Sequence, residues 1–328
     1  MTETTPKDFF LINTFKTERQ YLLYGSFYPS RNPKILHIIF GMFMFLYSWT
    51  EFFSMAAVLF IEKDNLTKLS ETLLFCMTQA AFLCKLTNFL MHNKEMAEIE
   101  ELLKHPILND LSVTETKIVE SYMIQFKYLS TVYRILCILC VVFYGMFPFI
   151  DEDPEHLSPL PGWFPFDIKQ YQYEIVLAQT AGIGIGAFNN SSLDILATIL
   201  ITLGSAQFDI LKHKLQTDEG RSKPRIRQIK NCVIYHNILL EYIAKVENLF
   251  NNGIFVQFAA SVVVICLTGF QMLVISVKSI QFILLMIYFS TMTCQIALYC
   301  WYGNELMCRS IGLPEACYMS EWNNGSSE

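Results

Sequence analysis

Charged side chains are too scarce in this sequence to cover a soluble globule of its size. Asp, Glu, Lys and Arg supply 16% of the 328 residues, while 53% are hydrophobic, and the mean hydropathy is +0.34. This is more apolar surface than one soluble core of this length would bury. The composition therefore predicts a protein that folds in a bilayer, with membrane lipid as its first expected partner.

Features that would indicate other classes are also lacking. The N-terminus, MTETTPKDFFLINTFKTERQ, has no apolar core of the signal-peptide type, so we expect it to stay in the cytosol. The ten cysteines form no disulfide framework, and the six histidines lack metal-ligand spacing. No Ser/His/Asp group or phosphate-binding loop occurs in a plausible context. We therefore expect neither an enzyme nor a cofactor, metal or nucleic-acid partner.

The sequence does contain six apolar stretches that could cross a bilayer, which takes about 20 residues. They are Ile35–Ile61, Leu69–Met91, Tyr128–Ile150, Tyr173–Leu203, Gly253–Val277 and Ser279–Tyr302. The predicted fold class is an all-α polytopic transmembrane bundle over residues 35–302, after an N-terminal segment, 1–34, and before a tail, 303–328. Residues 93–127 and 209–252 predict helical extensions of the bundle. Ser112 and Glu115 form a capping box within the first of them.

The basic residues predict which ends of the spans face the cytoplasm. Of the 24 Lys and Arg residues, only Lys63, Lys68, Lys169 and Lys278 fall in loops on one side. Nearly all the others lie in the N-terminal segment, the two extensions and the tail, which the positive-inside rule makes cytoplasmic. Asn65 begins a glycosylation sequon on the opposite side, which agrees with that orientation.

Charged residues inside the predicted spans are costly in a bilayer and often functional. Lys85, Arg134 and Asp194 fall in the cytoplasmic halves of their spans, and we expect one polar layer in which Asp194 offsets one or both cations. Glu51 lies in the outer half of the first span, where it either hydrogen-bonds a neighbouring helix or lines a cavity. The stretch G-x-G-x-G from Gly182 follows no strand, so it favours helix packing or local flexibility over nucleotide binding.

The block YCWYGNELMCRSIGLPEACYMSEW near the C-terminus carries the most specific resemblance in the chain. It resembles the signature of the insect odorant-receptor family, an aromatic-Cys-x-x-Gly-Asn-Glu-Leu followed by Ser and then by Ala-x-Tyr-x-x-x-Trp. The matching positions are Cys300, Gly303, Asn304, Glu305, Leu306, Ser310, Ala316, Tyr318 and Trp322. Weaker similarity in LPGWFPFD, NNSSLDILATILITLGSAQFDIL and HNILLEYIAKVENLF extends the resemblance over essentially the whole chain.

The resemblance implies a tuning subunit that gates a non-selective cation channel as a heterotetramer with an odorant co-receptor. It implies the plasma membrane of a sensory-neuron dendrite, a small volatile odorant bound in the outer half of the bundle, and a pore lined by a seventh helix. The sequence ends at Glu328, shortly after Trp322, so we expect the pore helix to be missing and the chain as written not to conduct.

Depth and side-chain chemistry select candidate ligand-binding residues in the outer halves of the second, third and fourth spans. They are Phe75, Met77, Gln79, Phe143, Tyr144, Phe147, Tyr173, Leu177 and Thr180. Core packing of these side chains is the alternative explanation for each.

Three other classes share some of these features. A gustatory receptor has the same topology but a different C-terminal signature. A multi-span transporter would suit the intramembrane charges and a fourth span broken at its glycines, although no internal inverted repeat pairs two interrupted helices. A G-protein-coupled receptor would have an extracellular N-terminus, which the distribution of basic residues opposes.

Overall fold

A computed structural model of the chain describes residues 10–28, 34–61, 66–150, 158–165, 168–216 and 225–319. All regular elements in these ranges are helices, which confirms the predicted all-α class. Six of them are long and apolar enough to cross a membrane. They are α3 (Ile35–Ile61), α4 (Leu66–Met91), α7 (Val113–Ile150), α8 (Gln172–Gln216), α9 (Arg225–Val274) and α10 (Ile280–Ile311).

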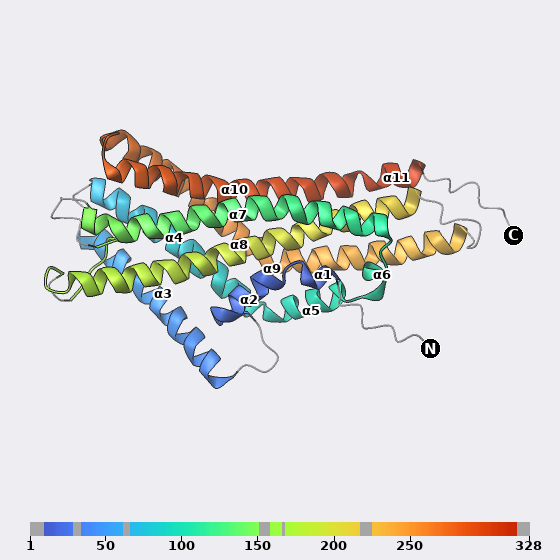
Figure 1. Ribbon diagram of the computed structural model, residues 1–328, viewed down its shortest axis with the longest axis horizontal. Coiled ribbons are helices and arrows are strands. Elements are labelled where there is room, and N and C mark those ends of the chain that lie inside the picture. The colour runs from blue at the N-terminus through green and yellow to red at the C-terminus, as the bar shows by residue number, and fades with distance from the viewer. Residues whose placement is uncertain are drawn as a thin grey trace.

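The helices run on well beyond the apolar stretches that predict them. The 50 residues of α9 span about 75 Å at 1.5 Å per residue, against a hydrocarbon layer of about 30 Å. Figure 1 shows α7, α8, α9 and α10 lying side by side along the long axis, while α3 crosses the bundle obliquely. The molecule therefore has a loop end, where α3 and α7 end and α10 begins, and a terminal end, where α8 ends, α9 begins and the last helix, α11 (Leu313–Met319), lies.

Helix α8 lies at the centre of the bundle. It contacts α7, α9 and α10 along its length and also packs against α2, α3, α4 and α11. Its segment from Leu193 to Leu200 is buried all round, and its two polar side chains, Asp194 and Thr198, form hydrogen bonds inside the bundle. It is continuous for 45 residues through the three glycines of the G-x-G-x-G stretch, so the broken fourth span that would have suited a transporter is not present.

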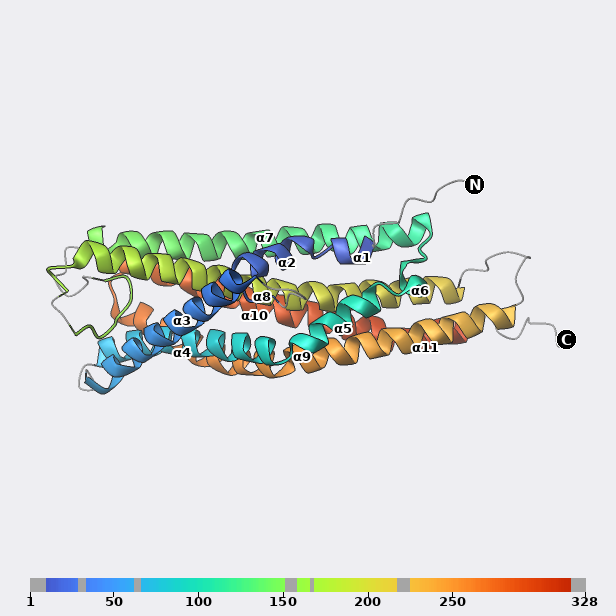
Figure 2. The same cartoon turned by 90° about the horizontal axis from the view of Figure 1, so that it is seen from below.

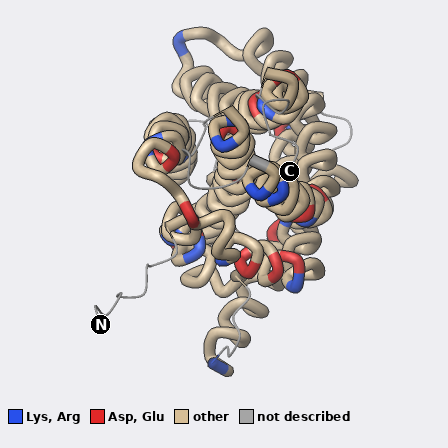
Figure 3. The backbone as a smooth tube through the Cα atoms, turned by 90° about the vertical axis from the view of Figure 1, so that its right-hand side faces the viewer, with Lys and Arg blue, Asp and Glu red and all other residues tan. Residues whose placement is uncertain are grey.

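The shorter helices add a compact layer toward the terminal end. They are α1 (Phe10–Asn13), α2 (Lys16–Tyr24), α5 (Asn93–Leu103), α6 (Pro106–Asn109) and α11 (Leu313–Met319). Figure 2 shows α2 beside α8 and α5 beside α9, and α1 contacts α5. Leu11, Phe15 and Leu22 are completely buried there, so the N-terminal segment is part of the core. Figure 3, which faces the terminal end, shows both basic and acidic residues around it.

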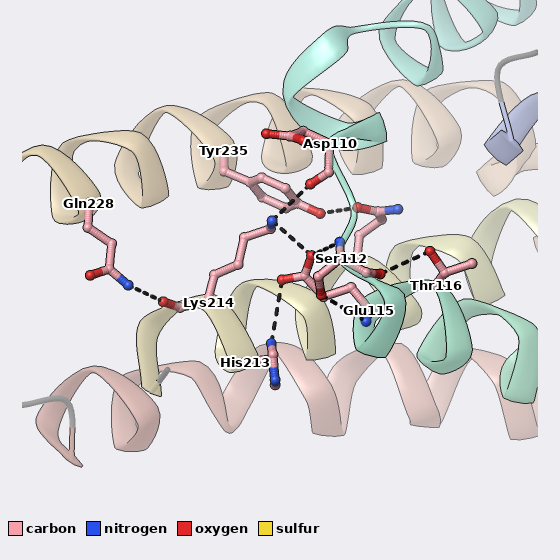
Figure 4. A network of polar contacts seen from close by, with 9 residues as sticks. Asp110, Ser112, Glu115, Thr116, His213, Lys214, Gln228 and Tyr235 are labelled. Carbon is pink, nitrogen blue, oxygen red and sulfur yellow. Dashed lines mark hydrogen bonds and ion pairs between the residues drawn. The ribbon is translucent and has the colours of Figure 1, made fainter. Parts of the chain in front are cut away.

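A polar network joins the beginning of α7 to the end of α8. Ser112 and Glu115 form the predicted capping box, with Ser112 N donating to Glu115 Oε2 at 2.8 Å and Glu115 N to Ser112 Oγ at 3.2 Å. The same carboxylate accepts from Lys214 Nζ at 3.0 Å and lies 3.4 Å from His213 Nδ1 (Figure 4). One carboxylate thus caps α7 and fixes its position along α8.

Buried apolar side chains form two clusters of different size. The larger runs from the middle of the bundle to the terminal end and includes Leu86, Leu200 and Tyr242. The smaller lies toward the loop end, around Phe75 and Tyr288. The candidate site lies in the part of the bundle that this smaller cluster surrounds.

Candidate functional site

A cavity of about 130 Å³ opens among α3, α4, α7, α8 and α10, toward the loop end. Its walls are mainly aromatic and sulfur-containing, with an edge of small residues from α8. The aromatic and sulfur-containing residues are Phe75, Phe82, Tyr133, Tyr144, Tyr288, Met55, Met292, Cys137 and Cys140. Gly182, Ile183, Gly186, Ala187 and Asn190 supply the edge from α8. Such a lining suits a small, mostly apolar molecule.

Three aromatic rings close the cavity toward the loop end. The ring centroids of Phe75 and Tyr144 are 5.3 Å apart, those of Phe75 and Tyr288 5.7 Å, and those of Tyr144 and Tyr288 6.2 Å. All three pairs are edge-to-face, the geometry that aromatic quadrupoles favour. The Tyr288 hydroxyl is also 2.5 Å from Thr78 Oγ1, which fixes α10 against α4. Beyond the rings lies a second pocket of about 170 Å³, also lined by Phe75 and Tyr144.

A buried carboxylate, Asp194, lies on the opposite side of the cavity from these rings, next to Tyr133. Lys85 Nζ donates to Asp194 Oδ1 at 2.6 Å, Tyr133 Oη to Oδ2 at 2.8 Å, and Tyr299 Oη to Oδ1 at 2.7 Å. Gln295 Nε2 also donates to Oδ2. Asp194 is 1% exposed, and this set of donors compensates the loss of water around its charge. The cluster thereby connects α4, α7, α8 and α10.

The structure brings Lys85 to Asp194 but directs Arg134 elsewhere. Arg134 Nη2 pairs with Glu18 Oε2 of α2 at 2.6 Å, and its guanidinium lies 4.7 Å from the centre of the Tyr21 ring. Consecutive helical residues point about 100° apart, so α7 can turn Tyr133 toward Asp194 only by turning Arg134 toward α2. Burial raises the pKa of Glu18 above its ordinary value, although the Arg134 charge opposes the shift.

Glu51 of α3 lines the cavity, and its Oε1 atom is buried without a hydrogen-bond partner among the described residues. Its neighbour Tyr47 donates to the carbonyl oxygen of Ala178 at 3.0 Å. A Cβ atom added to Gly182 would lie 2.5 Å from both Glu51 Oε1 and Tyr47 Oη. Only glycine at this position lets both polar side chains approach α8 so closely.

A groove of about 990 Å³ on the flank of the bundle meets the cavity at Glu51, Met55 and Leu160. It runs between α3, α8 and the segment from Leu160 to Phe164. This segment is held against α3 by two hydrogen bonds, Ser54 Oγ to Trp163 O at 2.9 Å and Trp163 N to Ser54 O at 3.2 Å. The three shared residues therefore lie at the junction between the cavity and an open approach to it.

Three of the candidate ligand-binding residues line the cavity, namely Phe75, Gln79 and Tyr144. Phe147 lines the second pocket beyond the rings. Met77 packs against the smaller apolar cluster. Thr180 lies between α8 and α7, where a Cβ on Gly145 would come within 2.6 Å of its methyl carbon.

The remaining three candidates lie on the outer surface of the bundle. Tyr173 is 75% exposed, Leu177 74% and Phe143 38%. Phe143 precedes Tyr144 and therefore points about 100° away from it. Tyr173 stacks on Phe149 at 5.8 Å, outside the cavity. These three side chains do not line the cavity, because depth in a span does not specify the direction around the helix.

The predicted set of ligand-binding residues included none from α10 or α3. Tyr288, Thr291 and Met292 line the cavity from α10, and Met55 lines it from α3. The spacing of Tyr288, Met292, Gln295 and Tyr299 places them on one helix face, a sequence signal that could have identified α10 as a wall of the site.

Other predicted residues lie far along the chain from the cavity or outside the described ranges. Of the C-terminal signature, Cys300, Asn304 and Tyr318 are exposed, Gly303, Glu305 and Ser310 are half-buried, and Ala316 is buried. Asn65 and Trp322 lie outside the described residues. No cluster of metal-ligating side chains occurs in the part of the chain that the structure describes.

Comparisons with known proteins agree on one kind of relative. The model of the family described as 7tm Odorant receptor matches residues 65–328. Odorant receptor Or1 of Anopheles gambiae is 25% identical over 301 residues, which cover 81% of this chain and 69% of that relative. Odorant receptor 46a, isoform A, of Drosophila melanogaster is 24% identical over 322 residues, which cover 94% of this chain and 83% of that relative.

Solved structures with the same fold include the insect olfactory receptor OR5 from Machilis hrabei. The TM-score is 0.84 at 12% sequence identity, over 98% of this chain and 86% of that one. The structure of OR5 in complex with eugenol gives a TM-score of 0.86 at 14% identity, over 98% and 87% of the two chains. At these identities the likeness shows a common fold.

Proposed function

From the premise that this chain belongs to the 7tm odorant receptor family, we propose that it binds small volatile odorants in the cavity and gates a cation channel. The relatives are receptors, so we assign no enzymatic activity to the chain, which is a multi-pass membrane protein. The proposed partner is an odorant co-receptor in a heterotetramer, in the plasma membrane of a sensory-neuron dendrite. In this proposal the terminal end is cytoplasmic.

The cavity walled by Phe75, Tyr144 and Tyr288 is the observation that carries the proposal. It is mostly apolar, and it joins the groove on the flank of the bundle at Glu51, Met55 and Leu160. A ligand that enters there replaces water at aromatic and sulfur-containing walls, which favours binding through buried apolar area. The receptor OR5, whose fold is similar, has been solved in complex with eugenol, and this supports the same use of the bundle here.

Helix α10 would carry the effect of binding away from the cavity. Tyr288 and Met292 line the cavity, and Gln295 and Tyr299 on the same helix donate hydrogen bonds to Asp194. A ligand that moves Tyr288 acts on a continuous helix whose next turns are fixed to the central cluster. We propose that this helix couples odorant binding to the channel through two arrangements of the Asp194 cluster.

Binding is tested first on the purified chain, by the rise in Tm across a panel of volatile compounds, because a ligand specific for the folded state stabilises it. A Gly186→Leu variant puts a side chain into the cavity, since a Cβ at Gly186 meets nothing within 4 Å. Gly269→Leu is the matched control, because that glycine is equally free of neighbours and does not line the cavity. We expect Gly186→Leu to weaken binding at least tenfold and Gly269→Leu to bind like wild type.

Gating is tested separately by whole-cell current from cells that co-express an odorant co-receptor. Residues 1–328 and a form extended by a further C-terminal helix are both recorded with ligands that pass the binding test. Odorant-dependent current from either form, reduced by Gly186→Leu and kept by Gly269→Leu, supports the proposal. If ligands bind but neither form gives current while present at the cell surface, the proposed odorant site is supported and the proposed gating role is contradicted.

A further inference from the structure

Among the described residues, the Tyr47 hydroxyl is the side-chain donor that lies beside Glu51, and Glu51 Oε1 has no geometrically formed hydrogen bond. That atom is buried. The Tyr47 hydroxyl has a single proton, which it donates to the Ala178 carbonyl oxygen at 3.0 Å and which Glu51 competes to accept. Its phenolic oxygen therefore remains as a second acceptor beside Glu51, and both oxygens lie over the bare Cα of Gly182.

Among the described residues that line the cavity and the groove, no positive charge balances this carboxylate. No Lys, Arg or His occurs among the described residues that line the cavity or the groove. Glu174, exposed in the first turn of α8, adds a second carboxylate to the groove. Both the approach and the junction with the cavity are therefore electronegative, an arrangement that raises the local concentration of cations.

An unpaired carboxylate at membrane depth is costly, and a ligand that brings the missing donor removes that cost. A protonated primary amine offers three N–H donors and a positive charge in one small group. The cavity beyond Glu51 is apolar and aromatic, which suits a hydrocarbon body, and its rings also attract cations.

We propose that Glu51, with the phenolic oxygen of Tyr47, forms an ammonium-binding subsite at the junction of groove and cavity. The preferred ligands are small volatile amines with an apolar body, whose ammonium group binds at Glu51 while the body lies in the cavity. This deepens the proposed function and rests on it, because it names the ligand class of the same site.

The test compares three ligands of nearly the same shape, 2-phenylethylamine, 2-phenylethanol and propylbenzene, on the purified chain at pH 7. Affinities are measured by titration calorimetry and by ligand-dependent Tm. We expect wild type to bind the amine at least tenfold more tightly than propylbenzene. In Glu51→Gln the amine should lose at least tenfold in affinity while propylbenzene is unaffected, so the preference for the amine over propylbenzene should shrink at least tenfold.

Two further carboxylate variants show whether position or charge decides the preference. Glu51→Asp keeps the charge and should still prefer the amine, which also guards against misfolding as the cause of loss. Glu120→Gln makes the same chemical change on the exposed face of α7 and should bind all three ligands like wild type. Glu174→Gln keeps the amine preference if Glu51 holds the ammonium, and loses it if the groove carboxylate does.

Failure of this inference can be told apart from failure of the proposed function. If wild type prefers propylbenzene or 2-phenylethanol, or if Glu51→Gln leaves the amine affinity unchanged, the amine subsite is wrong and the odorant site remains. The amine subsite is equally wrong if none of the three ligands binds while other members of the volatile panel do. An absence of binding across the whole panel would overturn both.

Discussion

Asp194 and Glu51 are two carboxylates within one helical bundle, and they differ in how many hydrogen-bond donors the surrounding helices provide. Asp194 receives hydrogen bonds from Lys85, Tyr133, Gln295 and Tyr299, which come from three other helices. Glu51 Oε1 receives none from the described residues. A charge whose donors all come from the chain connects helices, whereas a charge that lacks a donor is available to a molecule from outside.

The two ends of the bundle also differ, because one is filled by packed side chains and the other has space for a ligand. Toward the terminal end the larger apolar cluster packs continuously, and it even includes Leu11, Phe15 and Leu22 of the N-terminal segment. Toward the loop end the packing leaves a cavity of about 130 Å³ and a groove of about 990 Å³ around Glu51. Stability and ligand space are therefore concentrated in different parts of the chain.

Removing the Asp194 carboxylate should have the largest effect on stability, because it breaks the buried ion pair with Lys85. Glu51 has no such ion pair among the described residues. In Asp194→Asn the Lys85 ammonium would remain buried without a counter-charge. Removing one partner of a buried ion pair typically costs about 3–5 kcal/mol. We expect most of the folded receptor to be lost, measured by Tm and by the yield of monodisperse protein in detergent.

The double variant Asp194→Asn with Lys85→Met is the control for this prediction. It removes both charges, so part of the lost Tm should return. An Asp194→Asn protein as stable as wild type would mean that Asp194 is not the counter-ion on which Lys85 depends.

A methyl group at Gly182 should have an intermediate effect and tests how tightly Glu51 is held. The added Cβ would lie 2.5 Å from Glu51 Oε1 and from Tyr47 Oη, so both side chains must move. Overpacking of this kind costs about 1–3 kcal/mol. We expect Gly182→Ala to lower the Tm, while Gly186→Ala, whose Cβ meets nothing within 4 Å, leaves it near the wild-type value. Equal Tm values for the two variants would show that Glu51 is loosely placed.

Neutralising Glu51 should have the smallest effect on stability and sharpens the contrast with Asp194 most directly. Glu51→Gln removes a charge that has no hydrogen-bond partner at Oε1 among the described residues. The free energy of unfolding without ligand should therefore increase, or decrease by less than about 1 kcal/mol, as measured by the Tm. Glu120→Gln on the surface of α7 provides the baseline for the same substitution. A large loss of stability in Glu51→Gln, without one in Glu120→Gln, would mean that Glu51 stabilises the fold as Asp194 does.

The six long helices were predictable because apolar runs of sufficient length are an unambiguous signal. The sequence also predicted helical extensions over 93–127 and 209–252, but not the residues at which α7, α8, α9 and α10 begin and end, because packing between helices replaces lipid contact where the sequence becomes polar. Helices α1 and α2, of 4 and 9 residues, carry too little periodicity to be recognised before their packing is known.

Depth along a span was predictable for the site, and direction around the helix was not. Depth placed Lys85 near Asp194 and placed Phe75, Gln79 and Tyr144 at the cavity. It could not tell Tyr144 from Phe143, because the two differ only in the face they occupy. For Glu51 the sequence allowed a helix contact or a cavity wall, and the structure places it in the wall.

The absence of a side chain at Gly186 also affects how receptors of this kind can change the range of ligands that they bind. Because a side chain at this position would grow into open space, each added carbon would reduce the room for a ligand while leaving the helix contacts of α8 intact. Successive substitutions at this position can therefore change the size of the ligand that the cavity accepts, while each variant still folds. One position of the central helix thus gives natural variation a graded control over which molecules a receptor of this kind admits.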